Sequence, residues 1–515
     1  MNGAESLVRT LVAGGVKVCF ANPGTSEMHI VAALDTAPEI RCVLGLFEGV
    51  ATGAADGYAR MTEKPACTLL HLGPGLANGL ANLHNASRAK SPILNIVGQH
   101  AVQHLPYDTP LTSDIEGIAR PYSKWLRTSR NAAAVGRDAA EGLIASRSEQ
   151  GQIGTLIVPA DAAWSNGGKV AEISTLPRGK QPSLAAVDYA AKMLRFGLRT
   201  AIMLYGKSLY GKGLQIAGNI AAATGAKLLS PYPFARMERG MGVPVVERTN
   251  YVLEQAVEQL KDFRQLILVG AQPPVAYFAY PEKTSVLTSP DCTIHTLATA
   301  EEDAVSALDV LAEALSISRS NSMPRTKMPR ASTLSGEITL SGLASVVGAL
   351  LPENAIVVDE SMTSGRGMMA ATKGAPAHDW LANTGGSIGI ALPLAVGAAV
   401  ACPERKVLCL SADGSSMYTL QALWTMARES LDITTVVFAN RAYGVLKREF
   451  AGLGVGDPGP HAQSLFDIGH PNLDWVQLAK GMGVPAQRAD SLEDFARALQ
   501  AGFEGNGPSL IEVPL

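Results

Sequence analysis

The sequence of 515 residues has little charge, few cysteines and no long hydrophobic run. Asp, Glu, Lys and Arg make up 17% of it, and the formal net charge at pH 7 is -3. No Lys- and Arg-rich stretch with interleaved aromatic residues occurs, so the composition gives no sign of nucleic-acid binding. The six cysteines lie far apart and form no CxxC pair, which argues against a disulfide framework and against a cysteine metal site.

The sequence also lacks the signals of secretion and of membrane insertion. Its first residues, MNGAESLVRTLVAGGV, show no charged segment followed by an apolar core, as a signal peptide would. Gly, Pro or charged residues interrupt the apolar runs before they reach about 18 residues, the length that indicates a membrane-spanning helix. Scattered cysteines of this kind are typical of a reducing compartment. We therefore expect a cytoplasmic protein without membrane contact.

Short apolar, β-branched runs alternate with Ala-rich helical stretches along most of the chain. This alternation is typical of an α/β fold with parallel sheets. Strand-like runs include VKVCFANPG and PILNIVGQ in the first part, QLILVGAQ in the middle, and KVLCLSADG near the end. The chain length favours about three domains. We expect an N-terminal domain at 1–170, a central domain at 180–318, a Ser- and Pro-rich linker at 319–335 and a C-terminal domain at 336–515.

Two polar side chains follow strand-like runs in the C-terminal block. Asp413 comes after KVLCLSA and opens the turn DGSS, and Asn440 comes after ITTVVFA. Ligands of doubly wound sheets bind at the carboxyl ends of strands, so these two oxygens could hold a hard cation such as Mg²⁺. The turn would offer backbone N–H groups to a phosphate. Asp413 as a helix N-cap and Asn440 as a turn residue are equally compatible with the spacing.

The segment that holds both residues, SADGSSMYTLQALWTMARESLDITTVVFANRAYG, resembles the thiamine diphosphate signature of 2-oxo acid decarboxylases and acetohydroxyacid synthases. FEGVATGAADGYAR and GPGLANGLANLHNA resemble the pyrimidine domain of acetolactate synthase large subunits. NTGGSIGIALPLAVGAAV resembles the cofactor domain of benzoylformate decarboxylase. The resemblance extends over nearly the whole chain. It implies three doubly wound parallel-sheet α/β domains: pyrimidine-binding, central and diphosphate-binding.

The resemblance also implies a site for thiamine diphosphate and Mg²⁺. Asp413, Asn440 and the backbone carbonyl of Ala442 would hold the metal between the two phosphates. The chain departs from the family at Ala412, where Gly is usual, and at Met362, which replaces one member of a Thr/Ser pair. The other residues implied to bind the cofactor are Gly386, Ile388, Thr363, Gly414, Ser415 and Tyr443.

Among the residues, Glu48 has the most clearly defined role that the resemblance implies, which is activation of the cofactor. A buried glutamate against the aminopyrimidine ring can donate to the ring nitrogen, so that the ring's amino group can take up the C2 proton of the cofactor. The structural alternative is a carboxylate favoured by a helix N-terminus. In the same site, the Gly386 carbonyl would accept from the pyrimidine amino group, and Ile388 would wedge the cofactor into its bent shape.

On the substrate side, His71 corresponds to a catalytic histidine of benzoylformate decarboxylase, although a hydrogen-bonded structural histidine is the alternative. The second active-site histidine of that enzyme falls near 273–281, where this chain has Phe278 and Ala279. Glu449 would either select a cationic or hydroxylated acceptor or be a solvated helix residue. The remaining implied residues are Thr25 and Gln99 near the reacting centre, and Ser26, Val445 and Leu446 in the substrate pocket.

The resemblance implies an enzyme that decarboxylates a 2-oxo acid to a cofactor-bound enamine and joins it to an acceptor carbonyl, as acetolactate synthase does. The missing second histidine disfavours rapid protonation, and so disfavours a benzoylformate decarboxylase-like enzyme that releases an aldehyde. A pyruvate oxidase-like flavoenzyme is a further alternative, but FAD is not expected because LYGKSLYGKG does not resemble flavin-binding stretches. A non-catalytic cofactor-binding paralogue or partner subunit is the alternative from another class.

Sites of this family form between two subunits, which implies a homodimer or a dimer of dimers, that is, a homotetramer. The helix after Glu48 also presents small residues, Ala51, Thr52 and Ala55, at helical spacing. Small side chains let a neighbouring helix approach closely. We therefore expect this helix face to form part of a subunit interface.

Overall fold

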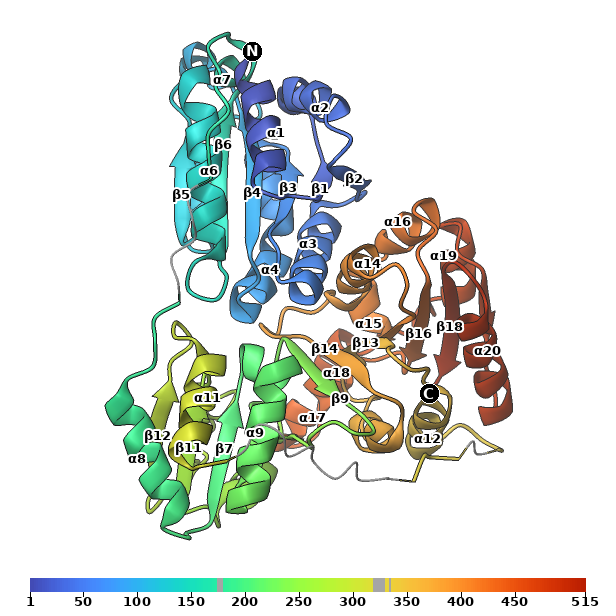
Figure 1. Ribbon diagram of the computed structural model, residues 1–515. Coiled ribbons are helices and arrows are strands. Elements are labelled where there is room, and N and C mark those ends of the chain that lie inside the picture. The colour runs from blue at the N-terminus through green and yellow to red at the C-terminus, as the bar shows by residue number, and fades with distance from the viewer. Residues whose placement is uncertain (174–178, 318–328, 333–334) are drawn as a thin grey trace.

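The computed structural model describes residues 1–173, 179–317, 329–332 and 335–515. Most of the predicted linker at 319–335 lies outside the described residues. The chain forms three α/β bodies, each built on its own sheet (Figure 1). The predicted fold class, three largely parallel-sheet α/β domains, is confirmed.

The first sheet has six parallel strands in the order β2-β1-β3-β4-β6-β5. The second strand, β2, is added on one side of β1, and β3 and the later strands are added on the other side. This reversal creates a topological switch point between β1 and β3. Its strands are β1 (Val18–Asn22), β2 (Arg41–Leu44), β3 (Ala66–Leu70), β4 (Ile93–Gln99), β5 (Trp125–Thr128) and β6 (Ile153–Pro159). Its helices are α1 (Gly3–Ala13), α2 (Met28–Asp35), α3 (Glu48–Thr62), α4 (Leu72–Ala89), α5 (Ile115–Ala119), α6 (Ala132–Arg147) and α7 (Ala160–Trp164), with 3-10 turns η1 (Thr25–Glu27) and η2 (Val102–Tyr107).

The second sheet has the order β10-β8-β7-β11-β12, and its strand pairs are parallel. Its strands are β7 (Thr200–Leu204), β8 (Lys227–Ser230), β10 (Glu247–Arg248), β11 (Gln265–Val269) and β12 (Thr293–Ala298). Its helices are α8 (Leu184–Arg195), α9 (Gly211–Thr224), α10 (Leu253–Leu260) and α11 (Ala304–Ala314), with the 3-10 turn η3 (Gly206–Leu209).

The third sheet has seven strands in the order β17-β18-β16-β15-β13-β14-β9. Its strands are β9 (Arg236–Arg239), β13 (Ile356–Glu360), β14 (His378–Ala382), β15 (Val407–Ala412), β16 (Ile433–Ala439), β17 (Ala486–Arg488) and β18 (Ser509–Pro514). Its helices are α12 (Leu340–Leu350), α13 (Met368–Ala371), α14 (Ala391–Ala401), α15 (Asp413–Ser416), α16 (Ala422–Arg428), α17 (Gly444–Gly452), α18 (Pro460–Phe466), α19 (Trp475–Gly481) and α20 (Leu492–Glu504), with the 3-10 turn η4 (Thr372–Gly374).

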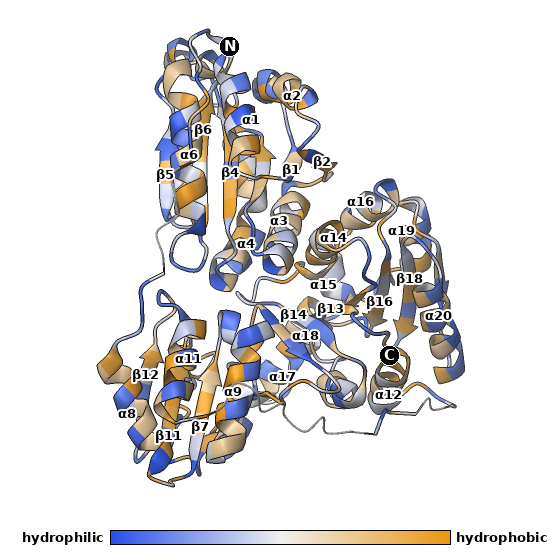
Figure 2. Cartoon of the chain, in the orientation of Figure 1, coloured by the Kyte–Doolittle hydropathy of each residue, from blue (hydrophilic) through white to orange (hydrophobic). Residues whose placement is uncertain are grey.

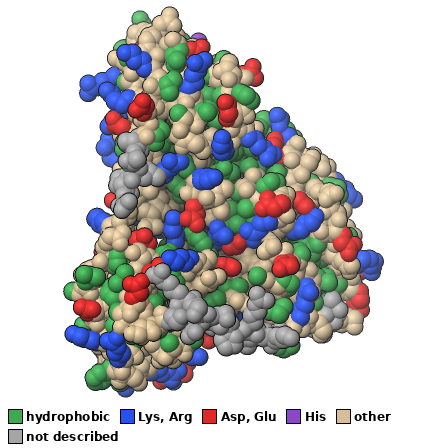
Figure 3. All heavy atoms as spheres, viewed as in Figure 1, with side chains coloured by type: hydrophobic (Ala, Val, Ile, Leu, Met, Phe, Trp, Pro, Cys, Tyr) green, Lys and Arg blue, Asp and Glu red, His purple; other side chains and the backbone are tan. Residues whose placement is uncertain are grey.

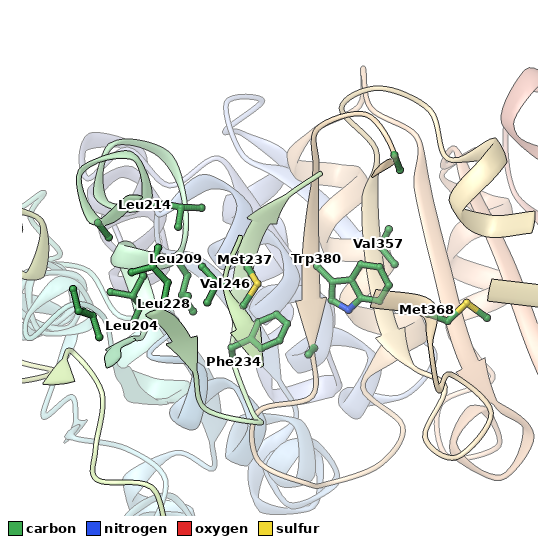
Figure 4. Packing of buried hydrophobic residues seen from close by; sticks show 14 of the residues in the cluster. Leu204, Leu209, Leu214, Leu228, Phe234, Met237, Val246, Val357, Met368 and Trp380 are labelled. Atoms are coloured by element: carbon green, nitrogen blue, oxygen red, sulfur yellow. The ribbon is translucent and has the colours of Figure 1, made fainter. Parts of the chain in front are cut away.

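The edge strand β9 belongs by sequence to the middle block, yet it pairs antiparallel with β14 of the third sheet (Figure 1). The two domains consequently share a hydrophobic core. Met237 of β9 and Trp380 of β14 are fully buried in the cluster that also contains Leu204 of the central sheet (Figure 4). Apolar residues are concentrated on the central strands, whereas the outer helices carry both polar and apolar residues (Figure 2).

The small residues of α3 pack inside the chain, against α14 and α4. A Cβ on Gly57 would lie 2.2 Å from the Leu394 carbonyl oxygen, so the α3 and α14 backbones touch. Thr52 donates to the Gly79 carbonyl of α4 at 3.0 Å. Ala51 and Ala55 are buried in the same core. The prediction that this face forms a subunit interface was therefore wrong, because helices of the same chain already cover it.

Acidic and basic side chains are intermixed on the face that Figure 3 shows. Within the described ranges, no helix is both long and apolar enough to cross a membrane.

Candidate active site

Glu48 is the first residue of α3 and its side chain is almost completely buried. Asn78 of α4 donates to its Oε2 at 3.0 Å. Its Oε1 lies over Gly75, where an added Cβ would be 3.1 Å from this oxygen and 3.3 Å from the Cβ of His71. The structure therefore brings Glu48 and His71 together over Gly75, at the carboxyl edge of the first sheet.

Glu27 pairs with His71, and the sequence analysis missed it. Its Oε2 lies 2.8 Å from His71 Nδ1 and accepts the Gly24 N–H at 2.7 Å. Glu27 is fully buried, and its Oε1 has no hydrogen-bond partner. With Glu27 ionised, Nδ1 carries the proton and Nε2 is left for a ligand. In the sequence, Glu27 three residues after Gly24 has the spacing of an ordinary helix cap, which conceals the pairing.

Gly24→Ala is expected to break this pair and to destabilise the protein by about 2 kcal/mol. The added Cβ would lie 2.2 Å from His71 Nδ1, so the ring would have to leave the buried Glu27 carboxylate. The backbone of Gly24 is extended and tolerates alanine, so the strain would come from the ring alone. Urea unfolding measures the loss. Gly452→Ala, which meets open space, is the control, and equal stability of both variants would contradict the pairing.

The other predicted residues of this edge line two different cavities. Thr25 and Ser26 border a cavity of about 450 Å³. Gln99, the last residue of β4, borders a smaller cavity of about 210 Å³ together with Ser113. Its Oε1 accepts the His100 N–H at 2.8 Å. Gln99 thus lines a different cavity from Thr25 and Ser26.

Asp413 and Asn440 lie at the carboxyl ends of β15 and β16, which are neighbours in the third sheet. Asp413 is buried; its Oδ1 accepts the Gly414 N–H at 2.8 Å and its Oδ2 accepts the Arg441 N–H at 2.7 Å. Burial raises the pKa of Asp413 above its ordinary value, and these N–H donors oppose the shift. Asn440 Oδ1 accepts the Ala442 N–H at 3.0 Å. The predicted proximity of the two strand ends is present.

Three further predicted residues surround this pair. Asn440 Nδ2 lies 3.5 Å from the Thr363 hydroxyl, which also faces Gly444. The Tyr443 ring covers Gly414, where a Cβ would be only 2.6 Å from the ring. Ser415 is buried beside them in α15. The short α15 and the Thr363 hydroxyl therefore face the same region as Asp413.

A buried carboxylate, Glu360, holds the loop that carries Gly386 and Ile388. Its Oε1 accepts from Asn383 at 3.0 Å, and its Oε2 accepts the Gly389 and Ala391 N–H groups at 3.1 Å each. Burial raises its pKa to about 7, against these hydrogen bonds. Asn383 in turn accepts the Gly386 N–H at 2.8 Å, and Gly386 has a φ of +80°, which only glycine adopts readily. Ile388 is half-buried in the same loop.

The predicted pocket residues Val445, Leu446 and Glu449 lie on α17, whose end approaches the central domain. Glu449 Oε2 accepts the Tyr280 hydroxyl at 2.5 Å, and this bond raises the pKa of Tyr280 to about 12. Glu449 is thus a partly exposed helix residue that is also hydrogen-bonded to the central domain. In the segment 273–281, the hydroxyl of Tyr277 lies against Gly386, 2.6 Å from where a Cβ would be.

The donor set at the third sheet fits a magnesium diphosphate group. It combines the buried carboxylate of Asp413, the amide oxygen of Asn440 and the backbone carbonyl of Ala442. All three are hard oxygen ligands. Within the described ranges, no cluster of three His, Cys, Asp or Glu side chains offers an alternative metal site. At the first sheet, buried Glu48 and the unpartnered Oε1 of Glu27 could bind a ligand that has hydrogen-bonding groups of its own.

Comparisons with known proteins agree with this arrangement. Residues 1–118 match the family profile "Thiamine pyrophosphate enzyme, N-terminal TPP binding domain", and residues 364–513 match "Thiamine pyrophosphate enzyme, C-terminal TPP binding domain". The "Putative acetolactate synthase large subunit IlvX" of Mycobacterium tuberculosis is 51% identical over 514 residues, which cover 100% of this chain and 99% of that protein.

Two decarboxylases are also similar to the chain. Benzoylformate decarboxylase of Pseudomonas aeruginosa is 29% identical, with 97% of this chain and 96% of that protein covered. The structure of a thiamine diphosphate-dependent 4-hydroxybenzoylformate decarboxylase from Rhodococcus jostii RHA1 superposes with a TM-score of 0.87 at 22% identity, covering 100% of this chain and 99% of that one. The chain belongs to the thiamine pyrophosphate enzyme family.

Proposed function

We propose that the protein is a cytoplasmic thiamine diphosphate- and Mg²⁺-dependent enzyme that removes CO₂ from a 2-oxo acid and joins the remaining acyl unit to the carbonyl of an acceptor. The observation that carries this proposal is buried Glu48 beside the Glu27–His71 pair, together with Asp413 and Asn440 at the ends of adjacent strands. The similarity to a protein named as an acetolactate synthase large subunit supports the same reaction class.

When bound, the cofactor supplies a carbon centre that stabilises negative charge after CO₂ leaves. The chain's residues would hold it and move protons around it. Asp413, Asn440 and the carbonyl of Ala442 would hold the metal, and Thr363 would contact a phosphate. Glu48 would keep a proton at the pyrimidine ring, in a pocket from which burial excludes water.

Transfer to a second 2-oxo acid gives a 2-hydroxy-3-oxo acid and CO₂, and the new hydroxyl takes up one proton. The imidazolium form of His71 would supply it from its Nε2–H group, because Glu27 accepts the hydrogen bond from Nδ1 and orients the ring. If the acyl carbon takes the proton instead, an aldehyde is released. Because the Glu27–His71 pair could also protonate the acyl carbon, decarboxylation with release of an aldehyde is the alternative function.

We also propose that each site is completed by two chains, in a homodimer or a dimer of dimers. The cofactor loop of the same chain contacts the far end of α4, where His84 lies 3.0 Å from the Gly385 carbonyl and Asn85 donates to the Ser387 carbonyl at 2.8 Å. Glu48 lies over Gly75, ten residues or about 15 Å earlier on this helix. One pyrimidine ring does not span that separation, so a loop from a partner subunit would meet Glu48.

The central domain is poorly suited to bind FAD. The strand order places β7 and β11 at the switch point of the second sheet, where a dinucleotide phosphate would meet the N-terminus of α9. There, Glu238 Oε2 already accepts the Gly211 N–H at 2.8 Å, and Lys207 pairs with Glu63 at 2.7 Å. A carboxylate at this position would repel a phosphate.

The test is CO₂ release from a panel of 2-oxo acids, with thiamine diphosphate and Mg²⁺ each present or omitted. We expect release only when both are present, and we expect mass spectrometry to find a 2-hydroxy-3-oxo acid. Aldehyde as the main product would favour the alternative function. Cofactor binding without any CO₂ release from the panel would count for a non-catalytic paralogue.

A further inference from the structure

The cavity that starts at Thr25 and Ser26 has a lining that the proposed reaction does not use. It has a volume of about 450 Å³ and lies at the carboxyl edge of the first sheet. One side is formed by the residues that follow β1, another by η2 and its flanks after β4, and a third by α7 after β6. It is therefore open to a ligand that approaches the strand ends.

Hydrogen-bond donors without a fixed charge dominate the polar part of this cavity. The polar lining residues are Thr25, Ser26, His100, Gln103, His104 and Tyr107. Asp, Glu, Lys and Arg are absent from the described lining. Asp161, on the adjacent α7, has its Oδ1 engaged by the Val102 N–H at 3.0 Å. The cavity thus offers hydroxyl, amide and imidazole donors, and no carboxylate of its own lining repels an anion.

Tilted ring contacts connect the two histidines and Tyr107. The ring centroids of His100 and His104 are 5.7 Å apart, and those of His104 and Tyr107 are 5.6 Å apart. His100 Nε2 also lies 3.3 Å from the Thr109 hydroxyl. Leu111 and Trp164 form the apolar part of the lining. A ligand with a short aliphatic stem and an anionic end matches both parts.

The cavity is adjacent to the reacting groups. Thr25 and Ser26 directly follow Gly24, against which the His71 ring packs. A substrate whose 2-oxo group lies at His71 and Glu48 can therefore extend its side chain past Ser26 into the cavity. Several of these donors are exposed and bond to water in the free protein, so a purely apolar side chain gains no hydrogen bond from them, whereas a carboxylate does.

We infer that this cavity binds the distal carboxylate of a dicarboxylic 2-oxo acid, with His104 and His100 as its principal donors. The inference rests on the proposed function for the identity of the reacting end. Hydrogen bonds from imidazoles and hydroxyls to a carboxylate are charge-assisted, so each is stronger than a bond between neutral groups. The aliphatic stem of the ligand lies along Leu111 and Trp164.

Binding is tested first without turnover, on the full chain loaded with thiamine diphosphate and Mg²⁺. Glutarate and pentanoate have the same number of carbons and differ in one carboxylate. Trp164 lines the cavity, so its fluorescence, isolated by subtracting a Trp164→Phe variant, reports occupancy. We expect glutarate to bind at least about tenfold more tightly than pentanoate, as a charge-assisted hydrogen bond implies. Equal affinity would overturn the inference.

Variants at His104 assign the selectivity to its imidazole. His104→Phe keeps a ring between His100 and Tyr107 but removes the donor, so glutarate should lose about tenfold in affinity while pentanoate is unchanged. His104→Asn restores a donor and should recover part of the loss. His29→Phe is the control, because His29 stacks on Trp164 at 5.8 Å without lining the cavity. Loss of glutarate affinity in His29→Phe as large as in His104→Phe would contradict the role of the cavity.

Turnover separates this inference from the proposed function. The ratio of kcat/KM for 2-oxoglutarate to that for 2-oxopentanoate should exceed one in the wild type and fall about tenfold in His104→Phe. Turnover of 2-oxopentanoate with no preference for 2-oxoglutarate would overturn the inference and leave the proposed function intact. Absence of CO₂ release from both acids, with selective glutarate binding, would overturn the proposed function alone.

Discussion

Glu48→Gln is expected to reduce cofactor-dependent CO₂ release at least about 100-fold while thiamine diphosphate still binds. Proton transfer by a positioned carboxyl group contributes roughly 10²- to 10⁴-fold to a rate, and glutamine cannot exchange a proton with the pyrimidine nitrogen. The substitution preserves shape, because the glutamine carbonyl can still accept from Asn78 at the position of Oε2. The rate at which the C2 proton of the bound cofactor exchanges with deuterium should fall with the turnover.

Glu63→Gln is the matched control for this variant. Glu63 caps the opposite end of α3 and forms an ion pair with Lys207 in which both side chains are more than 40% exposed. Exposed pairs of this kind contribute little, so activity and stability should stay near those of the wild type. Unchanged CO₂ release by Glu48→Gln, with an unchanged deuterium exchange rate, would remove Glu48 from the reaction.

The sequence predicts well those features whose pattern lies within one short segment of the chain. An apolar strand followed by Asp or Asn indicates a polar strand end, and the parallel sheet then brings Asp413 and Asn440 to the same edge. Glu48 was identifiable because its carboxylate ends an apolar run and precedes a stretch of small residues. The structure buries it at the start of α3, although its catalytic role stays a prediction.

The parts that escaped prediction depend on contacts between distant segments. Glu27 has the spacing of a helix cap, and only the fold brings His71, 44 residues later, to its carboxylate. Glu360 ends an ordinary buried strand, and its support of the loop around Gly386 requires β13 and that loop to meet. The small residues of α3 indicated close helix packing correctly, but a pattern on one helix does not tell whether its neighbour belongs to the same chain.

The position of β9 in the C-terminal sheet also escaped prediction from the sequence. Nothing in the short stretch Arg236–Arg239 distinguishes a strand of the central sheet from one of the C-terminal sheet. Its antiparallel pairing with β14 is fixed by tertiary contacts: Arg236 pairs with Asp379 at 2.7 Å, and Arg60 of α3 donates to the Ala235 and Ala382 carbonyls. These bonds join all three domains at one place, next to the loop that carries Gly386.

Asp413→Asn is expected to abolish the stabilisation that thiamine diphosphate and Mg²⁺ confer, as the difference between each protein with and without them. At a hundredfold excess over its dissociation constant, a ligand raises the free energy of unfolding by about 2.7 kcal/mol. Loss of the only carboxylate proposed for the metal should reduce this gain to near zero. Thermal unfolding with and without cofactor measures it.

Asp432→Asn is the control, since Asp432 precedes β16 at the opposite end of the strand that leads to Asn440, and pairs with Lys406 at 2.6 Å. This variant should keep the full cofactor-dependent gain. A gain in Asp413→Asn equal to that of the wild type would show that the metal is held elsewhere.

The pH dependence of the cofactor-free protein gives an independent check. Because burial raises the pKa of Asp413 in the folded state, folding favours its protonated form. Its contribution to stability is therefore present below the unfolded pKa and is lost as the pH rises through the folded pKa. Asparagine has no such loss, but its amide group would face the Gly414 or Arg441 N–H, which costs about 1–3 kcal/mol. In acid, the wild type should thus have a higher free energy of unfolding than Asp413→Asn, and this difference should shrink towards neutral pH. A difference that grew with pH would mean that the ionised carboxylate stabilises the folded chain even without a cation.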